Sequence, residues 1–142
     1  LLLSESLHLM GLFMERVTRD PTERSPFVDF DFPNGLLTMR GESYPENAAA
    51  FFGPLLEALR TFLDQLSGAR VKVTLEMAYF NSSTAKALMN MFQALEEAAH
   101  SGNEVTIYWC YHPEDDTMEE FGLDFAEDFH AAHFHLHATE AL

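Results

Sequence analysis

The centre of the chain reads VKVTLEM at positions 71–77, and this stretch decides the fold. Val71, Val73, Leu75 and Met77 alternate with polar side chains, a pattern typical of a strand that buries one face and exposes the other. One helical pattern precedes the stretch and another follows it. The chain is therefore predicted to alternate strands with helices, as α/β layered domains do.

The helical pattern before this strand has apolar residues in steps of four, as on one face of a helix. These residues are Phe51, Leu55, Leu59 and Phe62. We expect the helix to begin near Ser43, because a serine followed three positions later by Glu46 is a capping pattern, and Pro45 fits the first turn. The helix is expected to end before Gly68.

A β-hairpin is predicted upstream of this helix. Residues 27–32 alternate apolar with acidic side chains, residues 36–40 form a second strand, and Pro33-Asn34-Gly35 between them has turn chemistry. The length of 142 residues suits a single domain, which we expect to cover residues 27–142. Residues 1–26 are interpreted as an N-terminal extension and linker, because their second half is polar and contains proline.

Downstream of the central strand, a second helix is expected from Ser83 to His100, with Gly102 as its stop. A strand at 104–111, an acidic helix at 118–129 and a short strand at 134–137 follow. This order predicts an α/β fold: one domain with a mixed β-sheet and helices mainly on one face.

The charge of the chain disfavours two classes of partner. Its 23 acidic and 8 basic residues give a net charge of -15, and that field repels nucleic acids and anionic membrane surfaces. We therefore expect no nucleic acid and no membrane among the partners. The single cysteine, Cys110, cannot form a disulfide within the chain, which suits the cytoplasm, and its place among aromatic residues indicates a buried, unreactive thiol.

The turn Asn81-Ser82-Ser83-Thr84 joins the central strand to the second helix, so its hydroxyl groups lie beside the free N–H groups of the first helical turn. Taken alone, such a cluster is a helix cap, because Asn, Ser and Thr are favoured capping residues. A phosphate on one of these hydroxyls would also be stabilised there by the helix N-terminus. The two interpretations are compatible.

Three segments of the chain resemble the SiaC family of bacterial regulatory phosphoproteins. They are Gly41–Asn47 with its Ser-Tyr-Pro-Glu-Asn run, Tyr79–Thr84 with the following Ala87-Leu88-Met89, and Val105–Tyr111 with its Trp109. The resemblance covers roughly residues 30–137. It implies a STAS-like fold, similar to that of anti-sigma factor antagonists, and a non-enzymatic role in partner switching that uses no cofactor.

The resemblance also implies three protein partners. A HATPase-type protein kinase phosphorylates the turn, a PP2C-type phosphatase reverses this, and the unmodified protein activates a GGDEF diguanylate cyclase in c-di-GMP and biofilm signalling. The family phosphorylates a threonine directly after the asparagine, a position that is Ser82 here, with Ser83 and Thr84 as neighbouring alternatives. The expected partner-contacting residues are Glu42, Tyr44, Pro45, Glu46, Asn47, Tyr79, Asn81, Ser83 and Thr84.

Two other functions compete with this one. Histidines stand at positions 130, 133, 135 and 137, and the last three would share one face of a strand, where they could hold zinc in a metal-dependent enzyme. No metal is predicted, because no carboxylate is spaced with them in a recognisable motif. Alternatively, the chain is a constitutive scaffold in which Ser82 is only a helix cap. The acidic residues 114–116, 119 and 120 are interpreted as a solvated face, with a contribution to partner docking as the alternative.

Overall fold

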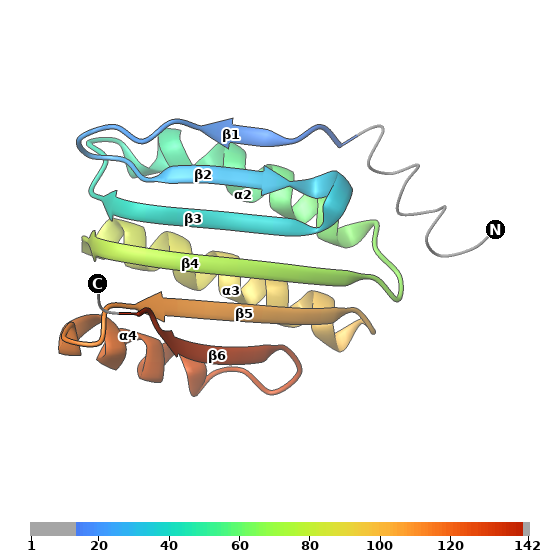
Figure 1. The fold of residues 1–142 in the computed structure, drawn as a ribbon. Helices are drawn as coiled ribbons and strands as arrows, with labels where there is room; N and C mark the ends of the chain where they lie inside the picture. Colours follow the sequence, from blue (N-terminus) through green and yellow to red (C-terminus); the bar gives the residue numbers. More distant parts are fainter. Residues whose placement is uncertain (1–13, 141–142) are drawn as a thin grey trace.

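The computed structural model describes residues 14–140, which form a mixed six-stranded β-sheet with three α-helices packed on one of its faces (Figure 1). The strands are β1 (Val17–Arg19), β2 (Phe27–Asp31), β3 (Leu36–Ser43), β4 (Arg70–Phe80), β5 (Glu104–Tyr111) and β6 (His133–Ala138). The α-helices are α2 (Ala48–Asp64), α3 (Ser82–His100) and α4 (Asp116–Ala126), and η1 (Phe32–Asn34) is a single 3-10 turn. The predicted α/β class is confirmed.

The strands lie in the sheet in chain order. β1, β2 and β3 pair antiparallel, as predicted for the hairpin of β2 and β3, whereas β3, β4, β5 and β6 pair parallel. One helix connects each parallel pair, so the carboxyl ends of β3, β4 and β5 lie at the same edge of the sheet, where the next helix begins (Figure 1). In open α/β sheets this edge is the usual place for binding sites.

The central strand β4 has the two-faced character that its sequence predicts. Val73 and Leu75 are fully buried on the side of the helices, whereas Lys72 and Glu76 are exposed on the other side of the sheet. On the next strand Trp109 is only 1% exposed and contacts aromatic rings of both α3 and α4. The core therefore lies between the sheet and its helices, and no helix of residues 14–140 covers the opposite face of the sheet.

The cap of helix α2 lies four residues later than the sequence predicts, at Asn47 and not at Ser43. Ser43 is the last residue of β3, where it pairs with Phe80 of β4, and it is fully buried. Asn47 caps the helix instead, because its side-chain oxygen accepts the backbone N–H of Ala50 at 3.0 Å. The prediction that the helix begins near Ser43 is wrong, because the pairing of β3 with β4 outweighs the local capping pattern.

The segment expected to be a linker is part of the fold. Val17 pairs with Phe30, so β1 is the first strand of the sheet. The polar residues after it form the turn from β1 to β2. In this turn the backbone N–H of Thr22 donates to the carbonyl of Ser25 at 3.0 Å, and the hydroxyls of the two residues lie 2.6 Å apart. The folded unit thus includes residues 17–26, and residues 1–13 of the expected extension lie outside the described residues.

The helices after the central strand lie close to their predicted positions. α3 begins at Ser82, one residue before the expected start, and α4 spans Asp116–Ala126 where residues 118–129 were expected. Within residues 14–140, no helix combines the length and the apolar character that are needed to cross a membrane.

Candidate functional site

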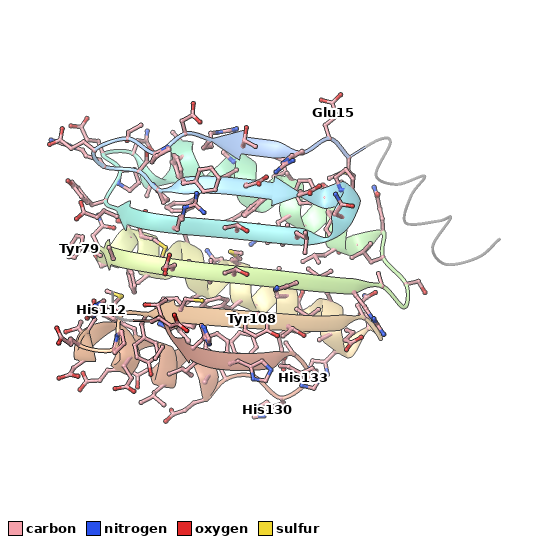
Figure 2. The ribbon with its side chains drawn as sticks, in the orientation of Figure 1. Glu15, Tyr79, Tyr108, His112, His130 and His133 are labelled. Carbon is pink, nitrogen blue, oxygen red and sulfur yellow. The ribbon has the colours of Figure 1, made fainter. Side chains whose placement is uncertain are left out.

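Two of the segments that resemble the SiaC family meet at the carboxyl ends of β3 and β4. Glu42 pairs with Tyr79 in the register of the two strands, and beyond them the chain turns into α2 and α3. Figure 2 shows the Tyr79 side chain at this edge of the sheet. We call the exposed and half-exposed residues there the edge surface: Glu42, Tyr44, Pro45, Glu46, Asn47, Tyr79, Asn81, Ser82 and Ser83.

A β-bulge directs Tyr79 toward solvent. The register between β3 and β4 runs residue by residue up to Gly41 and Met77 and then skips Ala78. Gly41 has a φ of 110°, a backbone conformation that glycine adopts readily. The skipped residue reverses the alternation of β4, so Phe80 is buried at 6% exposure while Tyr79 is 51% exposed.

Tyr44 lies beside Tyr79, with ring centroids 5.9 Å apart in an edge-to-face arrangement. The backbone N–H of Tyr44 donates to the carbonyl of Arg24 at 2.7 Å, and the Arg24 guanidinium pairs with the Glu46 carboxylate. The turn between β1 and β2 therefore supports the edge surface. The sequence gives no sign of this role for Arg24, because its polar segment is also typical of a linker.

Asn81 is the residue that caps α3. Its side-chain oxygen accepts the backbone N–H of Thr84 at 3.0 Å, and its carbonyl accepts the N–H of Ala85 at 2.9 Å. Ser82 follows as the first helical residue, and both Ser82 and Ser83 are exposed. The hydroxyl of Ser82 is thus not needed as the cap that the scaffold interpretation assigns to it.

Thr84 lies beneath the edge surface, not on it. Its side chain is fully buried, and its hydroxyl donates to the carbonyl of Ser43 at 3.1 Å and lies 2.8 Å from the Ser43 hydroxyl. This position contradicts the expectation that Thr84 contacts a partner, and it leaves Ser82 and Ser83 as the accessible hydroxyls of the turn. Ser43, expected only as a cap, is the partner that holds Thr84 in place.

The first turn of α3 is free of acidic residues, although the chain as a whole carries a charge of -15. Helix α4, in contrast, has Asp116 and Glu119 in its first turn. The cap of α3 is the uncharged Asn81, and Lys86 is exposed one turn beyond Ser82. The positive end of the α3 dipole can therefore stabilise a negative charge added at Ser82.

The carboxyl-terminal histidines lie apart from the edge surface. His133, His135 and His137 are exposed along β6, and the ring of His135 stacks on Tyr108 with centroids 5.4 Å apart. His130 precedes the strand, and Figure 2 shows it near His133 at the lower side of the sheet. Across residues 14–140, no group of three or more His, Cys, Asp or Glu side chains is arranged to hold a metal ion.

Cys110 lies on β5 and is half-buried, where the sequence predicts a buried thiol. Desolvation by burial, together with the charge of Glu76, raises its pKa, which keeps the sulfur as a thiol. A thiol of raised pKa is a poor nucleophile at neutral pH, in keeping with the predicted lack of reactivity.

The acidic run before and within α4 has partly structural roles. Asp115 caps the helix by accepting the backbone N–H of Met118 at 3.1 Å, and Glu119 accepts the hydroxyl of Tyr111 at 3.0 Å. This hydrogen bond raises the pKa of Tyr111. The other acidic side chains, Glu114, Asp116 and Glu120, are exposed, as expected for a solvated face.

Comparison with known proteins agrees with this geometry. The family model described as SiaC family regulatory phosphoprotein matches residues 19–139 of the chain. The uncharacterized protein PA14_02130 of Pseudomonas aeruginosa (strain UCBPP-PA14) is 34% identical over 108 residues, which cover 75% of this chain and 84% of that protein.

Solved structures show the same fold. Apo-SiaC from Pseudomonas aeruginosa matches with a TM-score of 0.79 and 30% identity, over 88% of this chain and 100% of that chain. The SiaC in a crystal structure of the diguanylate cyclase SiaD in complex with its activator SiaC, also from Pseudomonas aeruginosa, matches with a TM-score of 0.81 and 30% identity, over 87% of this chain and 99% of that chain. The resemblance seen in the sequence is confirmed.

Proposed function

The chain belongs to the SiaC family of regulatory phosphoproteins, and from this premise we propose that it is a non-enzymatic partner-switching regulator controlled at Ser82. In the unmodified protein, the edge surface binds and activates a GGDEF diguanylate cyclase, which raises c-di-GMP and so acts on biofilm formation. A phosphate on Ser82 weakens this contact. The state of one hydroxyl thus decides whether the cyclase is active.

The observation that carries this proposal is the position of Ser82. It is exposed in the first turn of α3, beside an uncharged cap and three residues after the exposed Tyr79 at the end of β4. The helix N-terminus tolerates an added phosphate, so the fold survives modification. A partner resting on Tyr79 would meet about -1.5 to -2 units of new charge, which is enough to change its affinity.

Two enzymes set the state of the switch. A HATPase-type kinase transfers the γ-phosphoryl group of ATP to Ser82 Oγ and releases ADP and a proton. A PP2C-type phosphatase hydrolyses the phosphoester and restores the hydroxyl. Both enzymes need an accessible side chain, a requirement that Ser82 meets and the buried Thr84 does not. Since ATP and the GTP used by the cyclase are cytoplasmic, we place the switch in the cytoplasm.

The class of effector is supported by a relative. SiaC of Pseudomonas aeruginosa is the activator of the diguanylate cyclase SiaD in the solved complex. We extend a GGDEF cyclase, as a class, to this chain. The net charge of -15 favours such a protein partner over nucleic acid or an anionic membrane.

Cyclase activation is tested directly. The unmodified chain is added to each purified GGDEF diguanylate cyclase of the organism that encodes it, and synthesis of c-di-GMP from GTP is followed over time. We expect one cyclase to be activated. Activation of none of them would overturn the proposal.

Control at Ser82 is tested with two matched variants. Phosphoserine is installed at position 82, or at position 83 as a control, by genetic code expansion, and each protein is added to the activated cyclase. Phosphoserine at 82 should abolish activation, while phosphoserine at 83 should reduce it less. Full activation by the protein with phosphoserine at 82 would refute this switch and favour a constitutive scaffold.

A further inference from the structure

We propose that Thr84 is a positioning residue that couples the phosphorylation state of Ser82 to the orientation of Tyr44 on the edge surface. This inference rests on the proposed function, since it describes how the modified turn reaches a second part of the same surface. Ser82 and Tyr44 lie on different elements, α3 and the loop after β3, so a signal between them needs a physical connection.

That connection is a set of three hydrogen bonds around Ser43. The backbone carbonyl of Ser43 accepts the N–H of Asn81 at 3.1 Å and the hydroxyl of Thr84 at 3.1 Å. The hydroxyls of Ser43 and Thr84 lie 2.8 Å apart. The last residue of β3 is therefore tied both to the cap and to the first turn of α3.

The burial of this pair makes its geometry exacting. Ser43 and Thr84 are both 0% exposed, so water cannot replace either hydroxyl as a partner. A buried hydroxyl that loses its hydrogen bond is costly, so the two side chains move together or not at all. A pair of apolar side chains would fill the same space but would not fix the orientation of α3 relative to β3. Hydrogen bonds are directional, so they hold β3 and α3 in one relative position.

A phosphate on Ser82 acts at the other end of this set. It brings acceptor oxygens into a turn where the N–H of Thr84 is already held by the side chain of Asn81 at 3.0 Å. Competition for the N–H groups of this turn shifts Asn81 and Thr84, and both of them bond to Ser43. Ser43 is followed directly by Tyr44.

Tyr44 is well placed to report such a shift. Its ring contacts Tyr79 at a centroid distance of 5.9 Å, and its N–H is held by the carbonyl of Arg24 at 2.7 Å. A displacement of Ser43 therefore changes how Tyr44 and Tyr79 meet a partner. The phosphate then acts in two ways, through its own charge and through the arrangement of the two tyrosines.

The test uses Thr84→Val, which keeps the shape of the side chain and removes its hydroxyl. Thr84→Ser restores the hydroxyl. Ser43→Ala removes only the hydroxyl–hydroxyl contact from the β3 side and leaves the bond from the Thr84 hydroxyl to the backbone carbonyl of residue 43, so the hypothesis stays testable if one variant folds poorly. Each is prepared with serine or phosphoserine at position 82. The affinity for the activated cyclase is measured by calorimetry, and the amide resonances of Tyr44 and Tyr79 are followed by NMR.

In the unsubstituted chain, phosphoserine should weaken binding at least about tenfold and shift the Tyr44 amide resonance. In Thr84→Val the ratio between the two states should shrink by at least about threefold, and the Tyr44 shift should largely vanish. In Ser43→Ala, which keeps the bond from the Thr84 hydroxyl to the backbone carbonyl, both effects should fall, but by less. Thr84→Ser should restore both. A merely structural role would lower affinity equally in both states and leave the ratio unchanged.

Two failures are distinguishable. If phosphoserine at 82 leaves the affinity of the unsubstituted chain unchanged, the proposed function fails, whatever the variants do. If that affinity falls but Thr84→Val and Ser43→Ala keep both the full ratio and the Tyr44 shift, the coupling through Thr84 is overturned while the switch itself stands.

Discussion

The side-chain oxygen of Asn81 accepts the backbone N–H of Thr84 at 3.0 Å, which makes Asn81 the cap of α3 and leaves Ser82 as an exposed first helical residue. Neighbouring polar residues of one turn thus have separate tasks. Asn81 satisfies the helix end, Thr84 ties the helix to β3, and Ser82 is free for modification. A hydroxyl that is not needed by the fold can carry a regulatory phosphate without unfolding the protein.

This division of tasks predicts a contrast in stability between two neighbouring positions. Asn81→Ala should lower the free energy of unfolding by about 1 kcal/mol, because the N–H of Thr84 loses its acceptor. Ser82→Ala should change it by less than about 0.5 kcal/mol, because Ser82 is exposed and Asn81, not Ser82, supplies the capping oxygen. Urea denaturation followed by circular dichroism measures both. Equal losses at the two positions would mean that Ser82 shares the capping.

The regular elements were predictable because each has a period. The alternation at 71–77 indicates a strand with one buried face, and the structure buries Val73 and Leu75 against the helices. The four-residue steps at Leu55 and Leu59 indicate a helical face in the same way, and both residues are at most 1% exposed. Local periodicity is visible in sequence because every residue on the face contributes to it.

The supports of the edge surface were not predictable by the same means. Ser43 has the local signature of a helix cap and is placed in a strand by its pairing with Phe80, which lies far along the chain. The bulge at Ala78 is a matter of register between two strands, and the three residues of β1 are too few to show a period. These features depend on tertiary contacts, so a single sequence does not display them.

The tight contact between α4 and β5 predicts that Gly122 does not tolerate a side chain. A Cβ at this position would lie 2.5 Å from Cδ1 of Trp109, whose ring is buried and donates a hydrogen bond to the carbonyl of Met118 at 2.8 Å. Gly122→Ala should therefore cost about 1–3 kcal/mol, despite the better helix propensity of alanine. Chemical denaturation monitored by Trp109 fluorescence measures the loss.

Gly53 is the matched control for this substitution. It lies within α2, and a Cβ there would meet no atom within 4 Å apart from its neighbours along the chain and the nearby backbone of its own helix. Gly53→Ala should change the stability by less than about 1 kcal/mol, because the better helix propensity of alanine is opposed by the contact of its Cβ with the ring of Pro54, the next residue. A loss at Gly122 no greater than the change at Gly53 would contradict the packing against Trp109.

The carboxylate of Glu96 holds the loop between α4 and β6, which predicts a dependence of stability on pH. It accepts the backbone N–H groups of His130 at 2.9 Å, Ala131 at 3.1 Å and Ala132 at 2.8 Å. Burial alone would raise the pKa of Glu96, but these N–H groups and the charge of His100 together lower it below its ordinary value of 4.5. The folded state therefore favours the carboxylate, and its contribution is lost as the pH falls below 4.5.

Glu96→Gln keeps the size of the side chain and removes the charge, so it should cost about 1–2 kcal/mol at neutral pH and much less in acid. Glu97→Gln at the next, exposed position should have little effect at either pH. Urea unfolding of the three proteins at about pH 7 and about pH 3.5 compares them. A difference between Glu96→Gln and the unsubstituted chain that persists unchanged in acid would exclude the carboxylate as its cause.

The edge surface predicts that Tyr79 is a principal contact for the cyclase. Tyr79 at the end of β4 is 51% exposed, and Leu36 at the start of β3, near the opposite edge of the sheet, is similarly exposed at 45%. Large aromatic side chains often dominate the energy of an interface. Tyr79→Ala should weaken binding of the activated cyclase at least about tenfold, or about 1.4 kcal/mol, whereas Leu36→Ala should change it less than about twofold.

Calorimetry with the unmodified proteins measures this pair, after circular dichroism has confirmed that both variants remain folded. Both side chains are exposed, so a difference between them reports the location of the interface, since neither forms the core. Equal binding by the two variants would remove Tyr79 from the interface. A stronger loss of affinity with Leu36→Ala would place the cyclase at the opposite edge of the sheet, away from Ser82. Because charges in solution are screened over roughly 8–10 Å, a phosphate on Ser82 could not control a cyclase bound there directly.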